Sequence, residues 1–342
     1  MSDFYQLDDA GQAACMAALG EIALTRWGIS EAKLDLIKYR ENAVFRAQLP
    51  DATCYALRIH RAGYHSDDEL RSELQWMAAL AESGIEVPTL VPSQDGEPFQ
   101  VVQGGDVPEP RQIDLFEWIE GEQLGSAEEG VVEVETIQAT YHMIGQLAAK
   151  LHNQATSWTL PPGFTRHAWD TDGLVGAQPF WGPFWELQAL SDEQRDLIGE
   201  ARERVQQDMQ AYAADPANAD RYSMIHADFV AENLMVDQGR VRLIDFDDAG
   251  FGWHLFELAT ALYFETEADY YEDAYQALIA GYREFRDLPD RQLAQLPLFM
   301  LARSFTYLGW VHTRFETQTA KELTPMLVGK ACAVAREYLG KT

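Results

Sequence analysis

Four polar side chains suited to phosphate chemistry lie close together in the chain. His226, Asp228, Asn233 and Asp245 flank two short apolar runs. Carboxylate and amide oxygens are the ligands that a hard cation such as Mg²⁺ takes in proteins. A carboxylate in a loop can accept or orient the proton of an attacking hydroxyl. The segment is therefore a candidate phosphoryl-transfer centre, in which Asp228 orients the hydroxyl and Asn233 and Asp245 bind the metal.

The two apolar runs are typical of the arms of a β-hairpin. Leu234–Val236 and Val241–Ile244 are separated by polar residues that include Gly239. If the turn centres on Gly239, Asn233 and Asp245 lie directly opposite each other. Opposed residues of an antiparallel pair have Cβ atoms roughly 4.5–5.5 Å apart. The spacing therefore predicts that both side chains can reach one cation.

Each of these residues also has a plain structural interpretation. A loop aspartate such as Asp228 often closes an Asx turn or caps a helix, and Asn233 can close a loop. Asp245 is harder to explain in this way, because a charge directly after an apolar run is costly unless something pairs with it. His226 is expected to be structural and to hold the loop through backbone hydrogen bonds. Asp228 already fits the role of base, which argues against His226 in that role.

The elements before residue 120 are predicted to be mostly strands. These residues form the first of two expected domains, 1–119, a lobe with an antiparallel sheet. Its predicted elements are helices over 6–27 and 67–83 and strands over 34–39, 43–49, 54–60, 98–103 and 112–119.

Residues 120–342 are predicted to be mostly helical and form the second lobe. It contains the catalytic hairpin, the substrate-binding helices and an insertion over about 154–215. The first part of the insertion, 154–185, is rich in Trp, Pro and Gly, and its aromatic residues predict order. The predicted helices cover 135–153, 191–213, 254–264, 270–285, 297–311 and 324–339.

Composition narrows the class of protein. The net charge of −29, from 26 basic and 55 acidic side chains, disfavours nucleic acid and anionic membranes as partners. No apolar run predicts a membrane helix, and the first residues do not form a signal peptide. Three scattered cysteines argue against disulfides and a zinc cluster. We expect a cytoplasmic monomer or homodimer that acts on a small molecule, and the acidic charge favours a cationic one.

The motif around the candidate centre resembles that of a known superfamily. His226-Ala-Asp228 followed by Asn233, together with Ile244-Asp-Phe246, looks like the catalytic and metal motifs of protein-kinase-like enzymes. The chain is most similar to the aminoglycoside phosphotransferase, choline kinase and homoserine-kinase-like family. Matching segments span about residues 30–310. The resemblance implies a bilobal α+β fold with an antiparallel N-lobe sheet and a mostly helical C-lobe, using ATP and Mg²⁺ between the lobes.

The resemblance also implies nucleotide contacts in the N-lobe. Arg58 matches the phosphate-binding base, and Glu73 matches its ion-pair partner, with Glu69 as the alternative. Adenine is expected against the inter-lobe segment Glu117, Trp118 and Ile119. Arg58 stands where such kinases usually have Lys, so a packed Arg stem is the alternative interpretation.

Two further departures concern the loops around the phosphates. The loop between the first two strands has no glycine, so phosphate binding there must be looser or use Asn42. This argues against a protein kinase. Asp247 replaces the glycine that follows the metal motif of protein kinases, and Asp247 or Asp248 can face the ion, a substrate amine or only a turn.

The predicted function is ATP-dependent phosphorylation of a hydroxyl on a small, amine-bearing metabolite. Amino alcohols like homoserine, hydroxylysine and choline are the candidate acceptors. Acidic and aromatic residues suit an ammonium group, and the candidate substrate contacts are Asp248, Glu257, Trp181 and Arg303. Arg303 is expected to pair with Glu257, with a substrate carboxylate as its alternative partner, and most of the aromatics are expected in the core.

Three other functions stay open from the sequence. An aminoglycoside-modifying kinase would use the same motifs. A nucleotide-binding pseudokinase or regulatory module is supported by Arg58 and the loop without glycine, but the intact set Asp228, Asn233 and Asp245 argues against it. A metal-dependent hydrolase using His226 would need further His ligands at regular spacing, and the sequence has none.

Overall fold

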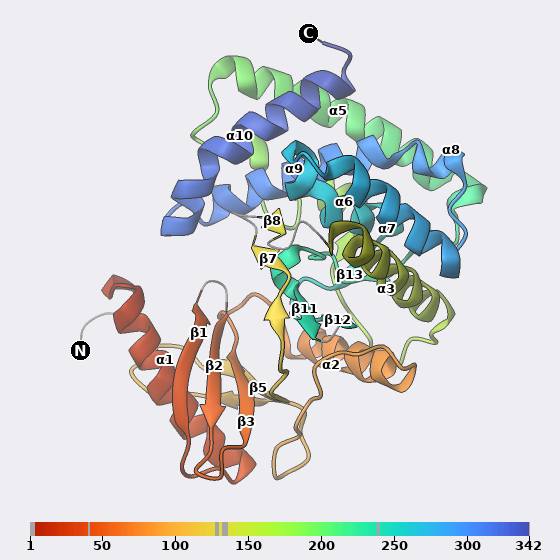
Figure 1. Cartoon of the computed structure of the whole chain (residues 1–342). Coiled ribbons are helices and arrows are strands. Elements are labelled where there is room, and N and C mark those ends of the chain that lie inside the picture. Colours follow the sequence, from red (N-terminus) through yellow and green to blue (C-terminus); the bar gives the residue numbers. More distant parts are fainter. Residues whose placement is uncertain (1–3, 40–41, 127–129, 132–135, 238–239, 342) are drawn as a thin grey trace. The chain divides into compact units, whose positions relative to one another are not determined.

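The computed structural model describes residues 4–39, 42–126, 130–131, 136–237 and 240–341. The chain divides into two compact units. The first contains residues 1–121 and 160–165, and the second contains residues 122–159 and 166–342. Figure 1 shows strands in the first unit and mainly helices in the second. The expected α+β fold with an antiparallel N-terminal sheet and a helical C-terminal part is confirmed.

The first unit is built on a five-stranded antiparallel sheet. Its strand order is β1-β2-β3-β5-β4. The central strand β3 pairs with β2 on one side and with β5 on the other, and this register places Arg58 opposite Asp114. The strands are β1 (Lys33–Tyr39), β2 (Ala43–Gln48), β3 (Cys54–Ile59), β4 (Gln100–Val102) and β5 (Arg111–Glu117).

Helix α1 (Asp9–Leu24) covers the sheet with an apolar face. Leu19 and Leu24 pack with Phe45 and Leu57 of the strands in one buried cluster. The helix begins at the side chain of Asp8 and continues as the short 3-10 helix η2 (Thr25–Trp27). A second short 3-10 helix, η1 (Phe4–Gln6), precedes it.

Helix α2 (Asp67–Glu82) begins with a capping box. The Ser66 side chain accepts the Glu69 backbone N–H, and the Glu69 carboxylate accepts the Ser66 backbone N–H. Both bonds satisfy amides that have no partner within the helix. The cap fixes where the helix begins and so which of its acidic residues, among them Glu73, turns inward.

The second unit is organised by long helices. Helix α3 packs closely on α7, and glycine makes this possible: a Cβ atom on Gly145 would lie 2.0 Å from the carbonyl oxygen of Leu278. The helices are α3 (Ile137–Ser157), α4 (Thr171–Val175), α5 (Asp192–Ala214), α6 (His254–Leu262), α7 (Tyr271–Phe285), α8 (Asp290–Leu293), α9 (Leu296–Thr313) and α10 (Gln318–Tyr338). Shorter 3-10 turns are η4 (Phe184–Glu186), η5 (Pro216–Asn218), η6 (Ala231–Asn233) and η7 (Tyr263–Glu267).

Small sheets connect these helices. One contains β12, β11 and β6, and another contains β10, β13 and β9. The strands are β6 (Glu122–Gln123), β7 (Gly125–Ser126), β8 (Gly130–Val131), β9 (Ala168–Trp169), β10 (Tyr222–Ile225), β11 (Leu234–Asp237), β12 (Arg240–Leu243) and β13 (Gly250–Trp253). The insertion is ordered as predicted, since its strand β9 pairs in parallel with β13.

The last predicted helix begins earlier than its pattern suggested. Pro325 lies inside α10, which begins after Thr317, whose side chain accepts the Ala320 backbone N–H. A proline is common in the first turn of a helix, whereas Pro325 lies in the interior of α10.

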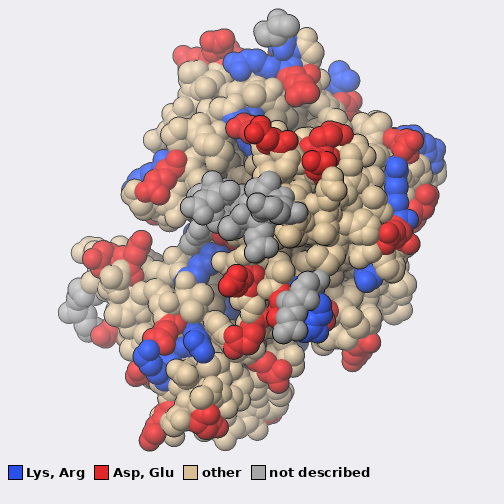
Figure 2. Space-filling model, in the orientation of Figure 1, with Lys and Arg blue, Asp and Glu red and all other residues tan. Residues whose placement is uncertain are grey.

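Two surface features follow from the sequence and the fold. Acidic side chains are spread over the face drawn in Figure 2, with basic side chains between them. Within the described ranges, no helix combines the length and the apolar character needed to cross a membrane.

Candidate active site

The loop from His226 to Asn233, between β10 and β11, has a strained backbone that a buried carboxylate holds in place. Ala227 adopts a left-handed φ of 64°, which costs an L-residue about 1–2 kcal/mol. Glu257, from α6, is fully buried, and its two oxygens accept the backbone N–H groups of His226 at 2.7 Å and Ala227 at 2.8 Å. These two charge-assisted hydrogen bonds hold the turn that presents Asp228.

His226 is structural, as predicted. Its ring is fully buried, and Nδ1 accepts the backbone N–H of Asp228 at 3.2 Å. Nε2 lies 2.9 Å from the carbonyl oxygen of Ile244 and donates to it, because Nδ1 already acts as the acceptor. Both ring nitrogens are thus engaged, which leaves no role as a base. The ring ties the loop to the end of β12.

Asp228 is oriented by two donors. Its Oδ2 accepts the Asn233 amide at 2.6 Å, and its Oδ1 accepts Nη2 of Arg303 at 3.0 Å. The side chain keeps 21% of its surface exposed, whereas Arg303 is fully buried. A partly exposed carboxylate with one donor on each oxygen still has lone pairs for a substrate hydroxyl.

Asn233 presents an oxygen that suits a hard cation. Its amide nitrogen donates to the carbonyl and to the carboxylate of Asp228, at 2.9 and 2.6 Å. The amide oxygen therefore points the other way, and within the described residues no donor reaches it. An amide oxygen and a carboxylate are ligands that Mg²⁺ takes together with phosphate and water. The amide oxygen of Asn233 thus fits the predicted metal, and Asp245 as the second ligand stays a prediction.

The predicted hairpin register is wrong by one residue. Asp237 pairs with Arg240, so two positions, 238 and 239, lie between them. The centre of the turn therefore falls between these two positions and not on Gly239. Gly239 itself lies outside the described residues. Asn233 is consequently opposite Ile244, whose N–H donates to the Asn233 carbonyl at 3.0 Å.

Asp245 is therefore one residue beyond Ile244, the residue that lies opposite Asn233. It also lies beyond β12 and has a left-handed φ of 63°. Strand alternation consequently does not set the direction of its side chain. A one-residue shift would reverse that direction in a regular strand, and the backbone turn at Asp245 removes this constraint.

The insertion fixes the loop that follows Asp245. The Arg166 guanidinium donates to the backbone carbonyls of Asp247 and Ala249, both at 2.5 Å. The Asp248 carbonyl accepts the Trp169 indole N–H at 2.9 Å and lies 3.0 Å from His167 Nε2. The Asp248 side chain is half-buried. The segment after the metal motif is thus held by residues far away in the sequence.

The substrate contacts predicted from acids and aromatics need correction. The expected pair of Arg303 with Glu257 is wrong, since Arg303 pairs with Asp228 and both Glu257 oxygens accept backbone N–H groups. Glu257 is fully buried and does not suit a substrate contact. Trp181 is also buried, and the Arg303 guanidinium lies 5.0 Å from its ring centroid. A cation of the chain itself occupies this aromatic cluster.

The first unit contains a buried charge cluster around Arg58. Its Nη2 donates to Glu73 at 2.8 Å and to Asp114 at 2.7 Å, and its Nε donates to Asp114 at 3.0 Å. The observed partner of Arg58 is thus Glu73, as predicted, and not the alternative Glu69. His60 Nε2 lies 3.0 Å from Asp114. Burial raises the pKa of Asp114, but the charge of Arg58 and the contact with His60 outweigh it and lower this pKa to about 2.

The remaining predicted nucleotide contacts lie in the same unit. The Asn42 side-chain oxygen accepts the Arg61 backbone N–H at 3.0 Å, so it ties the start of β2 to the chain that follows β3. Arg40 and Glu41 lie outside the described residues. The backbone N–H of Glu117 bonds to Thr89 at 2.9 Å, and that of Trp118 to Cys54 at 3.4 Å. Ile119 follows, and a role of these residues in adenine binding stays a prediction.

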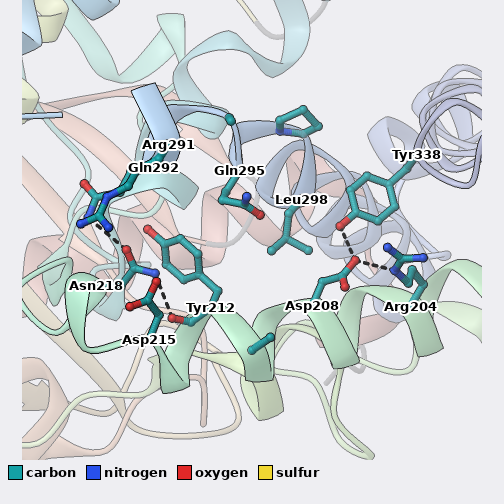
Figure 3. A pocket seen from close by; sticks show the side chains of 13 residues that line it. Arg204, Asp208, Tyr212, Asp215, Asn218, Arg291, Gln292, Gln295, Leu298 and Tyr338 are labelled. Atoms are coloured by element: carbon teal, nitrogen blue, oxygen red, sulfur yellow. Dashed lines mark hydrogen bonds and ion pairs between the residues drawn. The ribbon is translucent and has the colours of Figure 1, made fainter. Parts of the chain in front are cut away.

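A separate groove lies in the second unit, between α5, α8, α9 and α10. It has a volume of about 520 Å³, and none of the predicted site residues lines it. Figure 3 shows its side chains paired with one another: the Tyr338 hydroxyl donates to Asp208 at 2.7 Å, and so does Nε of Arg204, also at 2.7 Å. The groove therefore adds nothing to the candidate active site.

Sequence reasoning missed three residues that build these clusters. Asp114, within an apolar strand, is a charge in a run that predicts full burial, and this signal could have found it. Tyr307 lies one helical turn after Arg303 on α9, a spacing that brings side chains together. Arg166 carries no such signal, because its partners are backbone carbonyls.

Comparison with known proteins identifies the family. The phosphotransferase enzyme family matches residues 38–291, well over half of the chain. The chain belongs to this family. The family resemblance predicted from the sequence is thus confirmed, and the protein is a small-molecule kinase, a phosphotransferase that acts on a hydroxyl.

Similar proteins extend over nearly the whole phosphotransferase chain. The microcompartment-associated aminopropanol kinase is 31% identical, with a TM-score of 0.81 over 94% of this chain and 96% of that one. Amicoumacin kinase of Bacillus subtilis (strain 168) is 24% identical over 90% of this chain and 88% of its own. The amicoumacin kinase hAmiN, solved with AMP-PNP, Ca²⁺ and Ami, is 20% identical with a TM-score of 0.71, covering 97% and 95%.

Proposed function

We propose that this phosphotransferase transfers the γ-phosphoryl group of ATP to the hydroxyl of a short amino alcohol. The observation that carries the proposal is the pairing of Asp228 with Asn233. It orients a partly exposed carboxylate and directs the Asn233 amide oxygen away from Asp228, where it could bind a cation. The aminopropanol kinase similarity supports an amino alcohol as acceptor.

The residues of the second unit would share the chemistry as follows. Asp228 accepts a hydrogen bond from the acceptor hydroxyl and aims its oxygen at the γ-phosphorus. Asn233 and Asp245 hold Mg²⁺, which neutralises phosphate charge when it is bound. Catalysis in this class is mostly positioning and charge stabilisation. A carboxylate fixed by two donors suits that task.

Residues of the first unit would hold the nucleotide. Arg58 keeps the charge of the usual lysine, and two buried carboxylates fix its position. We propose that it contacts a phosphate, with Glu73 and Asp114 as its supports. Glu117, Trp118 and Ile119 are the proposed adenine contacts, and Asn42 supports the phosphate side.

The acceptor amine is proposed to contact acid rather than the buried aromatic cluster. Arg303 already occupies the cluster with Trp181. Asp248 stays half-buried, and its backbone is held by Trp169. Substitution of Asp248 by Asn should therefore raise KM for an amino alcohol more than it lowers kcat.

The test is a screen of ATP consumption with Mg²⁺ against amino alcohols, choline, sugars and aminoglycosides. We expect turnover with a short amino alcohol and a loss of roughly 100-fold or more in kcat for Asp228→Asn. Turnover that survives Asp228→Asn would contradict the role of Asp228. ATP binding without turnover on the whole panel would point to a regulatory module, and turnover only with aminoglycosides would point to a resistance-type kinase.

A further inference from the structure

Arg303 is a fully buried cation on helix α9 that contacts the proposed catalytic carboxylate. Its Nη2 donates to Asp228 Oδ1 at 3.0 Å, and its Nη1 donates to the carbonyl oxygen of Ala227 at 3.1 Å. It therefore reaches both the side chain and the backbone of the strained turn. Neither the motif nor the metal ligands require an arginine at this place.

The guanidinium is held in one orientation. Nη2 also donates to the Tyr307 hydroxyl at 2.8 Å. The ring centroids of Tyr307, Trp181 and Phe256 lie 4.2, 5.0 and 5.4 Å from its central carbon. Aromatic faces attract a cation, and the attraction is strongest where water is excluded. The planar group is thus fixed by hydrogen bonds and by ring faces.

The positive charge of Arg303 forms an ion pair with the Asp228 carboxylate. Burial lowers the pKa of the guanidinium, but the contacts with Tyr307 and Asp228 outweigh it and raise this pKa. A buried cation of this kind is costly when its partner is removed. Arg303 and Asp228 therefore depend on each other.

We propose that Arg303 is a positioning residue for phosphoryl transfer, which fixes the rotation of the Asp228 carboxylate through one hydrogen bond to that carboxylate and one to the Ala227 carbonyl oxygen. The proposal rests on the proposed function. In the step, the acceptor oxygen forms its bond to the γ-phosphorus, and the bond from that phosphorus to the β–γ bridging oxygen breaks. ADP leaves with the electron pair. The hydroxyl proton passes to Asp228 and then to solvent.

Each oxygen of the Asp228 carboxylate accepts a hydrogen bond from a different residue. Asn233 holds Oδ2 and Arg303 holds Oδ1, so a carboxylate that has lost Arg303 can rotate about its last bond. A misplacement of about 1 Å at a reacting centre can cost roughly 100-fold in rate. Loss of Arg303 should therefore lower kcat while leaving nucleotide binding unchanged.

The experiment compares Arg303→Ala with Arg314→Ala. Arg314 is also buried and lies 6.0 Å from the same Trp181 ring. We expect Arg303→Ala to lower kcat roughly 100-fold, with the ATP dissociation constant within about twofold, and added guanidinium to restore part of kcat. Arg314→Ala should keep kcat and show no response to guanidinium. Equal kcat losses in the two variants, or no rescue, overturn the proposal.

A milder variant covers the case in which Arg303→Ala does not fold. Tyr307→Phe removes one hydrogen bond from Arg303 and keeps the ring. It should lower kcat several-fold without changing the ATP dissociation constant. An unchanged kcat in a folded Tyr307→Phe, together with an unfolded Arg303→Ala, counts against the proposal.

A last measurement separates this inference from the proposed function. If the wild-type protein phosphorylates no acceptor of the panel, the proposed function fails. The hold of Arg303 on Asp228 is then tested by the unfolding midpoints of Arg303→Met, Asp228→Asn and the double variant. A double variant less destabilised than the sum of the single variants supports the pairing. Additive effects overturn it.

Discussion

Glu257 gives the sharpest test of how the catalytic turn is held. The perturbation is Glu257→Gln, which keeps the shape of the side chain and removes its charge. In the structure, the two carboxylate oxygens accept the N–H groups of His226 at 2.7 Å and Ala227 at 2.8 Å in a fully buried place. An amide has only one acceptor oxygen, so one of these N–H groups must lose its partner.

The magnitude follows from these contacts. A hydrogen bond to a charged group contributes about 1.5–3 kcal/mol, and a buried donor left without a partner costs about 1–3 kcal/mol. The turn also contains Ala227 at a φ of 64°, which costs about 1–2 kcal/mol and needs support. We expect Glu257→Gln to lower the free energy of unfolding by roughly 2–4 kcal/mol. Movement of Asp228 should lower kcat at least tenfold.

The assay is urea unfolding followed by tryptophan fluorescence, with steady-state kinetics on the folded protein. The control is Glu322→Gln, an exposed position on α10 where the same change should alter stability by less than about 0.5 kcal/mol. An unfolding free energy and a kcat for Glu257→Gln that both match this control would refute the reasoning. A loss of stability with kcat unchanged would show that the turn keeps its shape without Glu257.

Two further predictions concern the supports of each unit. The pKa of Asp114 is about 2, because Arg58 and His60 lower it against the effect of burial. The ionised carboxylate therefore stabilises the fold above about pH 4, and this contribution is lost as the pH falls toward about 2. Asp114→Asn should flatten this pH dependence of urea unfolding, by roughly 2–3 kcal/mol, and an unaltered slope would contradict the ion cluster. Gly145→Ala should destabilise the packing of α3 on α7 by at least about 1–3 kcal/mol, because its Cβ would lie 2.0 Å from the Leu278 carbonyl oxygen. A thermal scan beside Gly199→Ala, whose Cβ meets nothing within 4 Å, checks this, and equal midpoints would count against it.

The periodicity of the chain predicted most of its elements within a few residues. Helix α2 has a capping box at Ser66 and is followed by Gly84 at a left-handed φ of 80°, and such local signals act in the folded protein as they do in the sequence. The hairpin register was missed by one residue, because periodicity locates the arms but not the centre of the turn. The start of α10 was predicted at 324, whereas the helix begins after Thr317, whose side chain caps it.

The same division holds for the site. The spacing of His226, Asp228 and Asn233 predicted phosphoryl transfer, because these residues are neighbours in one loop and their types suffice for that prediction. The role of Glu257 was not visible in this way. Its partners are backbone amides, which every residue has, so no residue pattern marks them.

Tertiary structure alone decided where the buried charges pair. Arg303 was expected near Glu257, yet it lies against Asp228, which is far from it in sequence. Any acid of the second unit was a possible partner by composition, and only the packing of α9 on the catalytic loop selects one. The sequence thus determined the reaction type through local spacing. The fold decided which long-range partners orient the reacting groups, because a buried charge can pair only with the groups that packing places against it.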